Sequence, residues 1–148
     1  LIECKHLINW VLESERLNKY NEIIKHKQFF KECQNHKILL KKLLLTLKKK
    51  NKKIIGYGAS TKGNVLLQYC NINSKVLDCI AEVNKFKFNK YTPGSNIKII
   101  SEKAAKLKKP DYMLALPWHF KDHIIKREQN FLKKGGKIIF PLPDIEII

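Results

Sequence analysis

Arginine is scarce in this basic chain. Lysine and arginine together account for 30 of the 148 residues and give a net charge of +17, yet only Arg16 and Arg127 are arginines. Direct reading of bases and bidentate contacts to phosphate both favour arginine over lysine. We therefore do not expect nucleic acid as a partner, and a basic nucleic-acid-binding module stays a less favoured alternative.

The sequence also lacks the usual patterns of metal-binding and membrane-spanning proteins. The four cysteines, Cys4, Cys33, Cys70 and Cys79, show no CxxC spacing, which argues against a zinc site and a disulfide framework. The longest apolar stretch, residues 38–47, is interrupted by two lysines, and no cleavable apolar leader opens the chain. We expect a soluble, cytoplasmic protein with no metal site and no membrane partner.

Apolar spacing divides the chain into a helical region and an α/β region. Up to about residue 50, apolar residues recur at helical spacing, with a break near 18–21 and a second helix over 27–49. Beyond this point, short strand patterns alternate with helical ones, as in right-handed crossovers of a parallel sheet. We predict an α/β fold in which an N-terminal helical extension (1–50) precedes a Rossmann-like, mainly parallel sheet of about five strands (51–148). The expected strands are 53–57, 76–81, 97–100, 112–116 and 137–140, and the expected helices are 63–69, 101–108 and 121–133.

The stretch KKIIGYGASTKGN, residues 52–64, reads as a strand, a tight turn and the start of a helix. Glycines allow positive φ angles and close approach of a ligand, and the free amides at a helix start attract anions. The spacing fits neither a GxGxxG fingerprint, whose third glycine is replaced by Thr61, nor a P-loop, because Gly63 is not followed by lysine. A purely structural turn remains the alternative to phosphate binding. The predicted binding residues are Gly56, Tyr57, Gly58, Ser60, Thr61, Lys62 and Asn64.

Polar and aromatic residues follow two further expected strands. Glu82 and Asn84 come after the second strand, and Trp118 and His119 come after the fourth. If the strand order is 3-2-1-4-5, these loops share the carboxyl edge of the sheet with the glycine turn, where such folds bind ligands. Glu82 and Asn84 would bind ribose or sugar hydroxyls, and Trp118 and His119 would form a wall of the site. Each of these residues has an alternative role. Glu82 fits a solvated strand-end carboxylate, Trp118 a core residue and His119 a general base. A metal shared by His119 and His123 lacks further ligands.

Five motifs, in this order, resemble one known family. They cover residues 56–143 and resemble the C-terminal domain of S-adenosylmethionine-dependent C-methyltransferases that act on nucleotide-linked keto sugars. In the sequence they are GYGASTKGNVLLQYC (56–70), AEVN (81–84), YTPGSNIKIISE (91–102), PDYMLALPWHF (110–120) and GGKIIFPLP (135–143).

The resemblance implies that this chain binds a nucleotide-diphosphate sugar but does not methylate it alone. The family's cysteine-rich zinc segment and its S-adenosylmethionine loop are not found in this sequence, and the chain opens on Leu1 rather than methionine. We therefore expect a fragment that binds no cofactor itself, whose catalytic residues are unknown. The full-length enzyme would use S-adenosylmethionine, with N-terminal zinc and methyltransferase domains in the same or a companion chain. The alternative is a nicotinamide-dinucleotide-binding Rossmann module, either an oxidoreductase or a redox sensor.

Overall fold

The computed structural model describes residues 2–148, with side-chain burial described from residue 5 onward. The chain forms two compact units, which we call the helical unit, ending at His36, and the α/β unit, Lys37–Ile148. Helix α2 (Ile23–Lys49) crosses this boundary, so its last part belongs to the α/β unit.

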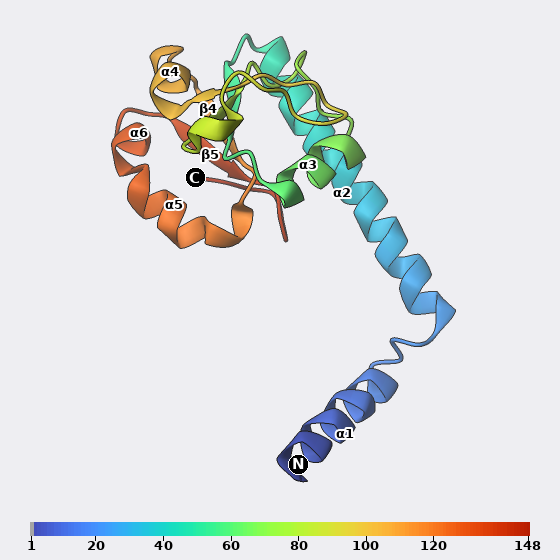
Figure 1. Cartoon of the computed structure of the whole chain (residues 1–148). Helices are drawn as coiled ribbons and strands as arrows, with labels where there is room; N and C mark the ends of the chain where they lie inside the picture. The colour runs from blue at the N-terminus through green and yellow to red at the C-terminus, as the bar shows by residue number, and fades with distance from the viewer. Residues whose placement is uncertain (1) are drawn as a thin grey trace. The chain divides into compact units, whose positions relative to one another are not determined.

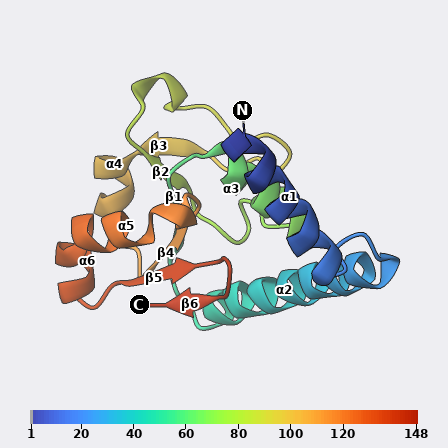
Figure 2. The same cartoon turned by 90° about the horizontal axis from the view of Figure 1, so that it is seen from below.

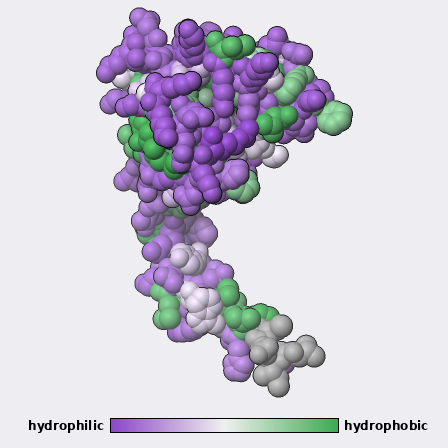
Figure 3. Space-filling model, turned by 90° about the vertical axis from the view of Figure 1, so that its left-hand side faces the viewer, coloured by the Kyte–Doolittle hydropathy of each residue, from purple (hydrophilic) through white to green (hydrophobic). Residues whose placement is uncertain are grey.

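The helical region has the two predicted helices. Helix α1 (Ile2–Leu17) ends where the break was expected, and α2 begins at Ile23, before the predicted start at residue 27. On the face in Figure 3, hydrophobic residues are visible on the helical unit, whereas most of the visible surface of the α/β unit is hydrophilic. None of the helices within residues 2–148 is both long and apolar enough to cross a membrane.

The α/β unit is built on one six-stranded sheet with the order β3-β2-β1-β4-β5-β6. Strands β1 to β5 pair in parallel, in the order 3-2-1-4-5 under which the three loops were expected to share one edge, and a short sixth strand that was not predicted pairs antiparallel with β5. The predicted α/β, mainly parallel fold is therefore confirmed. The strands are β1 (Ile54–Tyr57), β2 (Ile80–Glu82), β3 (Ile99–Ser101), β4 (Tyr112–Ala115), β5 (Lys137–Phe140) and β6 (Glu146–Ile147).

Helices cover both faces of this sheet (Figure 1 and Figure 2). Leucines of α2 and α3 pack on one face, together with Ile54, Leu114 and Ile139. Residues of the other helices pack on the opposite face with Ile55 and Met113. Neighbouring residues of a strand thus contribute to opposite cores, as the alternation of side chains in a strand requires. The helices of the α/β unit after α2 are α3 (Thr61–Tyr69), α4 (Glu102–Leu107), α5 (Lys121–Arg127) and α6 (Gln129–Lys133), with short 3-10 helices η1 (Lys85–Lys87) and η2 (Trp118–Phe120).

Two further elements differ from their sequence-based predictions. The second strand was expected over 76–81, but Val76 and Leu77 are buried in a turn in which both their amides bond to the carbonyl of Asn73. Their apolar character reflects core packing rather than strand pairing, so β2 starts only at Ile80. The helix expected over 121–133 is interrupted at Glu128, whose side chain is buried.

The strand order reverses between β1 and β4. From β1 the chain moves outward through β2 to β3, and then returns to place β4 on the other side of β1. In open α/β sheets, the crevice beyond the carboxyl ends of the strands at such a reversal is the usual ligand site. The fold therefore brings the glycine turn after β1 to the position where a ligand is expected.

Candidate functional site

The turn after β1 is tight and lies against the loop after β4. Gly58 has a φ of 78°, and a Cβ added there would lie 3.0 Å from the ring of Pro117. A side chain at this position would be strained by both the backbone angle and the contact. The amide of Gly58 also donates to the carbonyl of Ala81, which ties the turn to the end of β2.

The start of α3 can accept an anion. Ser60 caps the helix, because its Oγ accepts a hydrogen bond of 2.9 Å from the amide of Gly63. The amides of Thr61 and Lys62 belong to the first turn and cannot find acceptors inside the helix. These two donors and the positive end of the helix dipole favour a negatively charged group, and the exposed Lys62 side chain adds a cation nearby.

Gly63 has a packing role that the sequence spacing did not reveal. A Cβ on this residue would lie 2.6 Å from Cβ of Leu116 and 2.9 Å from Oγ of Ser60. The absence of a side chain therefore lets α3 approach the end of β4. Close helix–strand contact is the role given to the third glycine of dinucleotide-binding turns, and here it falls two positions later.

Glu82 is buried and joins two of the loops. Its carboxylate accepts hydrogen bonds from the amides of Ala59 (2.9 Å), Val83 (2.8 Å) and Asn84 (2.9 Å), and Lys87 lies 3.6 Å away. Burial alone raises the pKa of this carboxyl, but the three amide bonds and the Lys87 charge outweigh it and lower the pKa below its ordinary value. Glu82 thus fixes the turn after β1 to the loop after β2, while its binding of ribose hydroxyls stays a prediction.

Asn84 and Lys87 continue this connection. The side chain of Asn84 caps η1 by accepting the amide of Phe86 at 3.0 Å. Lys87 donates to the carbonyl of Ala59 at 2.8 Å, on the same turn that Glu82 contacts. The loop after β2 is therefore held in place by polar contacts before any ligand binds.

The loop after β4 contributes aromatic side chains. Trp118 is partly buried and packs against residues on both faces of the sheet. His119 is exposed, and its ring lies 4.2 Å from that of Phe120. Trp118 therefore has a clear packing function, whereas His119 is open to a ligand.

A pocket of about 280 Å³ lies between these loops. Tyr57, Gly58, Ser60 and Glu82, all predicted as binding residues, line it. The site residues predicted from sequence are thus brought together only in part. The predicted residues outside its lining are Gly56, Thr61, Lys62, Asn64, Asn84, Trp118 and His119.

The same pocket has lining residues that the sequence analysis did not assign to the site. Phe120 and His123 come from η2 and α5, Glu102 from α4, and Arg127 from the end of α5. His123 and Arg127 lie well beyond the end of β4 in sequence, so the rule that placed the loops could not find them, whereas Glu102 directly follows β3 and Phe120 directly follows His119. The scarcity of arginine was the available signal, because Arg127 stands out among the lysines.

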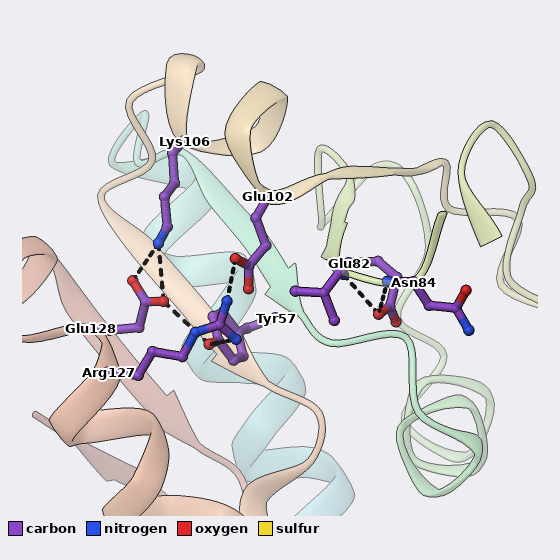
Figure 4. Close-up of polar contacts among 8 residues, drawn as sticks. Tyr57, Glu82, Asn84, Glu102, Lys106, Arg127 and Glu128 are labelled. Atoms are coloured by element: carbon purple, nitrogen blue, oxygen red, sulfur yellow. Dashed lines mark hydrogen bonds and ion pairs between the residues drawn. The ribbon is translucent and has the colours of Figure 1, made fainter. Parts of the chain in front are cut away.

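Arg127 belongs to a network of charged side chains (Figure 4). It donates to Glu102 at 2.5 Å and to the hydroxyl of Tyr57 at 3.1 Å. The Tyr57 hydroxyl lies 3.2 Å from Glu128, and Lys106 forms an ion pair of 2.7 Å with Glu128. Burial, together with the charge of Glu128, raises the pKa of Tyr57 far above its usual value, so the hydroxyl remains a donor to Glu128.

Asn64 makes no side-chain hydrogen bond to any described residue, although its Oδ1 is buried. A buried amide oxygen without a donor is unfavourable, which makes Asn64 a residue to test rather than an assigned ligand contact. Its predicted place in the binding site stays a prediction.

Cysteine and metal chemistry have little support in the described residues. Cys33, Cys70 and Cys79 are free thiols, and burial raises the pKa of Cys79 to about 11 and also raises that of Cys70. Cys4 lies outside the residues whose side chains are described. Within the described part of the chain, no three His, Cys, Asp or Glu side chains come together as metal ligands. The pair His119 and His123 therefore has no third ligand among these residues.

Known proteins are similar to this chain over nearly its whole length. A family model described as C-methyltransferase C-terminal domain matches residues 3–143. The C-methyltransferase NovU from Streptomyces niveus is 30% identical over 146 residues, which are 99% of this chain and 35% of the relative. The chain thus spans about one third of the length of that relative.

Proposed function

Because the chain belongs to the family of C-methyltransferase C-terminal domains, we propose that it binds the nucleotide-diphosphate sugar on which such an enzyme acts. The sugar is a nucleotide-linked keto sugar, and its diphosphate lies at the start of α3. Gly58, Ser60, Thr61 and Lys62 bind the phosphates. The observation that carries the proposal is the meeting of three loops at the point where the strand order reverses.

The geometry of these loops supports an anionic ligand in particular. Two first-turn amides, the Ser60 cap and the Lys62 side chain all belong to one short turn. Hydrogen bonds from such donors to a charged group contribute roughly 1.5 to 3 kcal/mol each. Glu82 and Asn84 complete the site on the β2 side, and Trp118 with His119 completes it on the β4 side.

The glycine spacing, rather than Glu82, favours this proposal over the alternative of a nicotinamide-dinucleotide module, because Thr61 stands where the GxGxxG fingerprint has its third glycine. In dinucleotide-binding domains, the acid at the end of the second strand accepts the ribose hydroxyls. Here both carboxylate oxygens already accept backbone amides. A ribose or sugar hydroxyl at Glu82, from either kind of ligand, would share oxygens that already hold two loops together.

We further propose that methyl transfer requires parts of the enzyme outside this chain. The relative NovU is much longer than the matched region, which leaves room for a methyltransferase domain that binds S-adenosylmethionine and for an N-terminal zinc domain. Exposed apolar side chains on the helical unit, among them Trp10 (70%) and Phe29 (67%), are suited to contact with such a domain. The catalytic groups of the reaction are proposed to lie there, in the same or a companion chain.

Replacing Lys62 tests the proposed phosphate site. Lys62→Ala should weaken binding of dTDP or UDP by roughly ten- to hundredfold, the equivalent of one charge-assisted hydrogen bond. Isothermal titration calorimetry on the full 148-residue chain measures this change. Lys49→Ala is the matched control, because Lys49 is an exposed lysine in the last turn of α2, where a helix end repels anions.

The same titrations separate the alternatives. Equal affinity of wild type and Lys62→Ala for the nucleoside diphosphates would remove Lys62 from the site. Binding of NADH without binding of dTDP or UDP would favour the dinucleotide module. Tight, strongly salt-dependent binding of long DNA or RNA would favour the nucleic-acid module.

A further inference from the structure

Arg127 is a cation in the candidate pocket that no strand-end loop supplies. It lines the pocket of about 280 Å³ together with Gly58 and Ser60 of the turn after β1. Its side chain is 41% exposed and is therefore only partly enclosed by the protein. A ligand that contacts Ser60, the cap of α3, within this pocket therefore comes near a guanidinium donor from α5.

The orientation of Arg127 is fixed by two neighbours. One terminal nitrogen donates to Glu102 and the other to the Tyr57 hydroxyl, and the guanidinium carbon lies 5.9 Å from the centre of the Tyr57 ring. Tyr57 is itself held because its hydroxyl bonds to Glu128. A lysine in this place, with one nitrogen, could not make both contacts with the same geometry.

Arg127 retains donor capacity after these contacts. Each contact uses one N–H group, and a guanidinium has several more in a planar fork. No other side-chain or backbone acceptor among the described residues takes them. A planar fork with free N–H groups, already oriented, suits the oxygens of a phosphate.

Two acids line the pocket, and both are paired within the protein. Glu82 is paired with Lys87 and three amides, and Glu102 is paired with Arg127 itself. Because these charges are paired within the protein, an anion would be held by oriented donors rather than by a large net positive field. Binding there should consequently depend only weakly on salt compared with a lysine-covered surface.

We propose that Arg127 is a second anion-binding residue of the site, whose free N–H groups bind a phosphate oxygen of the nucleotide from the α5 side of the pocket. This inference rests on the proposed function, since it names a further contact to the same ligand. It assigns Glu102 and Tyr57 as positioning residues that hold the guanidinium for this contact. Phosphate is thereby held between the Ser60 end of α3 and the side chain of Arg127.

The two arginines of the chain provide a matched test. Arg127→Lys keeps the charge but loses the fork, and should weaken binding of inorganic pyrophosphate and of dTDP by about tenfold. Arg16→Lys makes the same change in an exposed pair with Glu13 on α1, and should leave both affinities within about twofold of wild type. Calorimetry at two salt concentrations measures the affinities, and a thermal melt confirms that each variant is folded.

A comparison of ligands distinguishes phosphate contact from a general structural effect. Thymidine lacks phosphate, so the ratio of the dTDP affinity to the thymidine affinity should fall in Arg127→Lys and stay constant in Arg16→Lys. A constant ratio in Arg127→Lys overturns the inference. If Arg127→Lys does not fold, Tyr57→Phe removes only the orienting hydroxyl and should weaken pyrophosphate binding by about two- to fivefold, with unchanged affinity again counting against the inference.

The outcome also separates this inference from the proposed function. Arg127→Lys at wild-type affinity, with Lys62→Ala weakened, overturns the role of Arg127 and leaves the nucleotide site intact. A wild-type chain that binds neither pyrophosphate nor any nucleoside diphosphate overturns both.

Discussion

The two halves of α2 have similar apolar patterns and opposite surroundings. In the C-terminal half, which belongs to the α/β unit, Leu40 and Leu44 are fully buried against the sheet. In the N-terminal half, Phe29 and Phe30 are 67% and 62% exposed. An apolar stripe on a helix therefore does not indicate by itself which part of the stripe is buried, or which element buries it.

A single stripe runs through both halves. Phe30, Cys33, Lys37, Leu40 and Leu44 follow one another at alternating spacings of three and four, which places them on one side of the helix. Only the end of this stripe contributes to the core described here. The comparison teaches that stability in this chain comes from the α/β unit, and that matched changes in the helical unit should have little effect.

The largest contrast is expected from truncation of the stripe itself. Leu44→Ala removes a fully buried side chain and should lower the free energy of unfolding by about 2 to 5 kcal/mol. Phe30→Ala removes a larger but exposed side chain and should change it by less than about 0.5 kcal/mol. Urea unfolding followed by Trp118 fluorescence in a Trp10→Phe background reports on the α/β unit alone. Equal losses in the two variants would show that the N-terminal half is also covered in solution.

The second contrast is between two carboxylates. Glu82→Gln replaces an acceptor of three buried amides by a group that carries an N–H donor, and should lower the free energy of unfolding by about 1.5 to 3 kcal/mol. Glu13→Gln alters an exposed pair with Arg16 and should leave the melting temperature unchanged. Thermal melts of both variants at neutral pH make the comparison.

The pH dependence sharpens the role of Glu82. Because its pKa in the folded chain is lower than the ordinary 4.5, its stabilisation is complete above that value and is lost as the pH falls through the folded pKa. The difference between wild type and Glu82→Gln should therefore be constant near neutrality and shrink below pH 4.5. A difference that stays unchanged down to the acid transition would contradict the proposed clamp.

Most strands and helices of the α/β unit could be predicted from the sequence, because each depends on the pattern of apolar residues within its own short segment. Strands such as Lys137–Phe140 are short apolar runs, and their alternation with helices predicts right-handed crossovers and a parallel sheet. The exceptions are positions where tertiary packing replaced local preference. Val76 and Leu77 carry the pattern of a strand but are buried in a turn, and Glu128 interrupts a helical pattern with its side chain turned inward.

The site was predictable only where it depends on strand ends. Gly58 and Glu82 follow β1 and end β2, so the fold class alone places them at one edge. Arg127 and Glu102 come from two different helices, and their contact depends on how those helices pack. Glu82 accepts a hydrogen bond from the amide of Ala59. This contact depends on the path of the backbone in the turn after β1, which cannot be predicted from residue types.

The smallest contrast concerns a single hydroxyl. Tyr57→Phe keeps the buried ring but removes the donor to Glu128 and the acceptor of Arg127, and should lower the free energy of unfolding by about 1 kcal/mol. Tyr20→Phe, at an exposed tyrosine preceding α2, should have no measurable effect. Because the Tyr57 pKa is raised, its contribution is complete below the ordinary value of 10.0 and is lost only above it. Urea unfolding measures the free energy of unfolding of wild type and Tyr57→Phe at pH 7 and above pH 10. The difference between them should be smaller at the higher pH. No difference at pH 7 would mean that Lys106 alone satisfies Glu128.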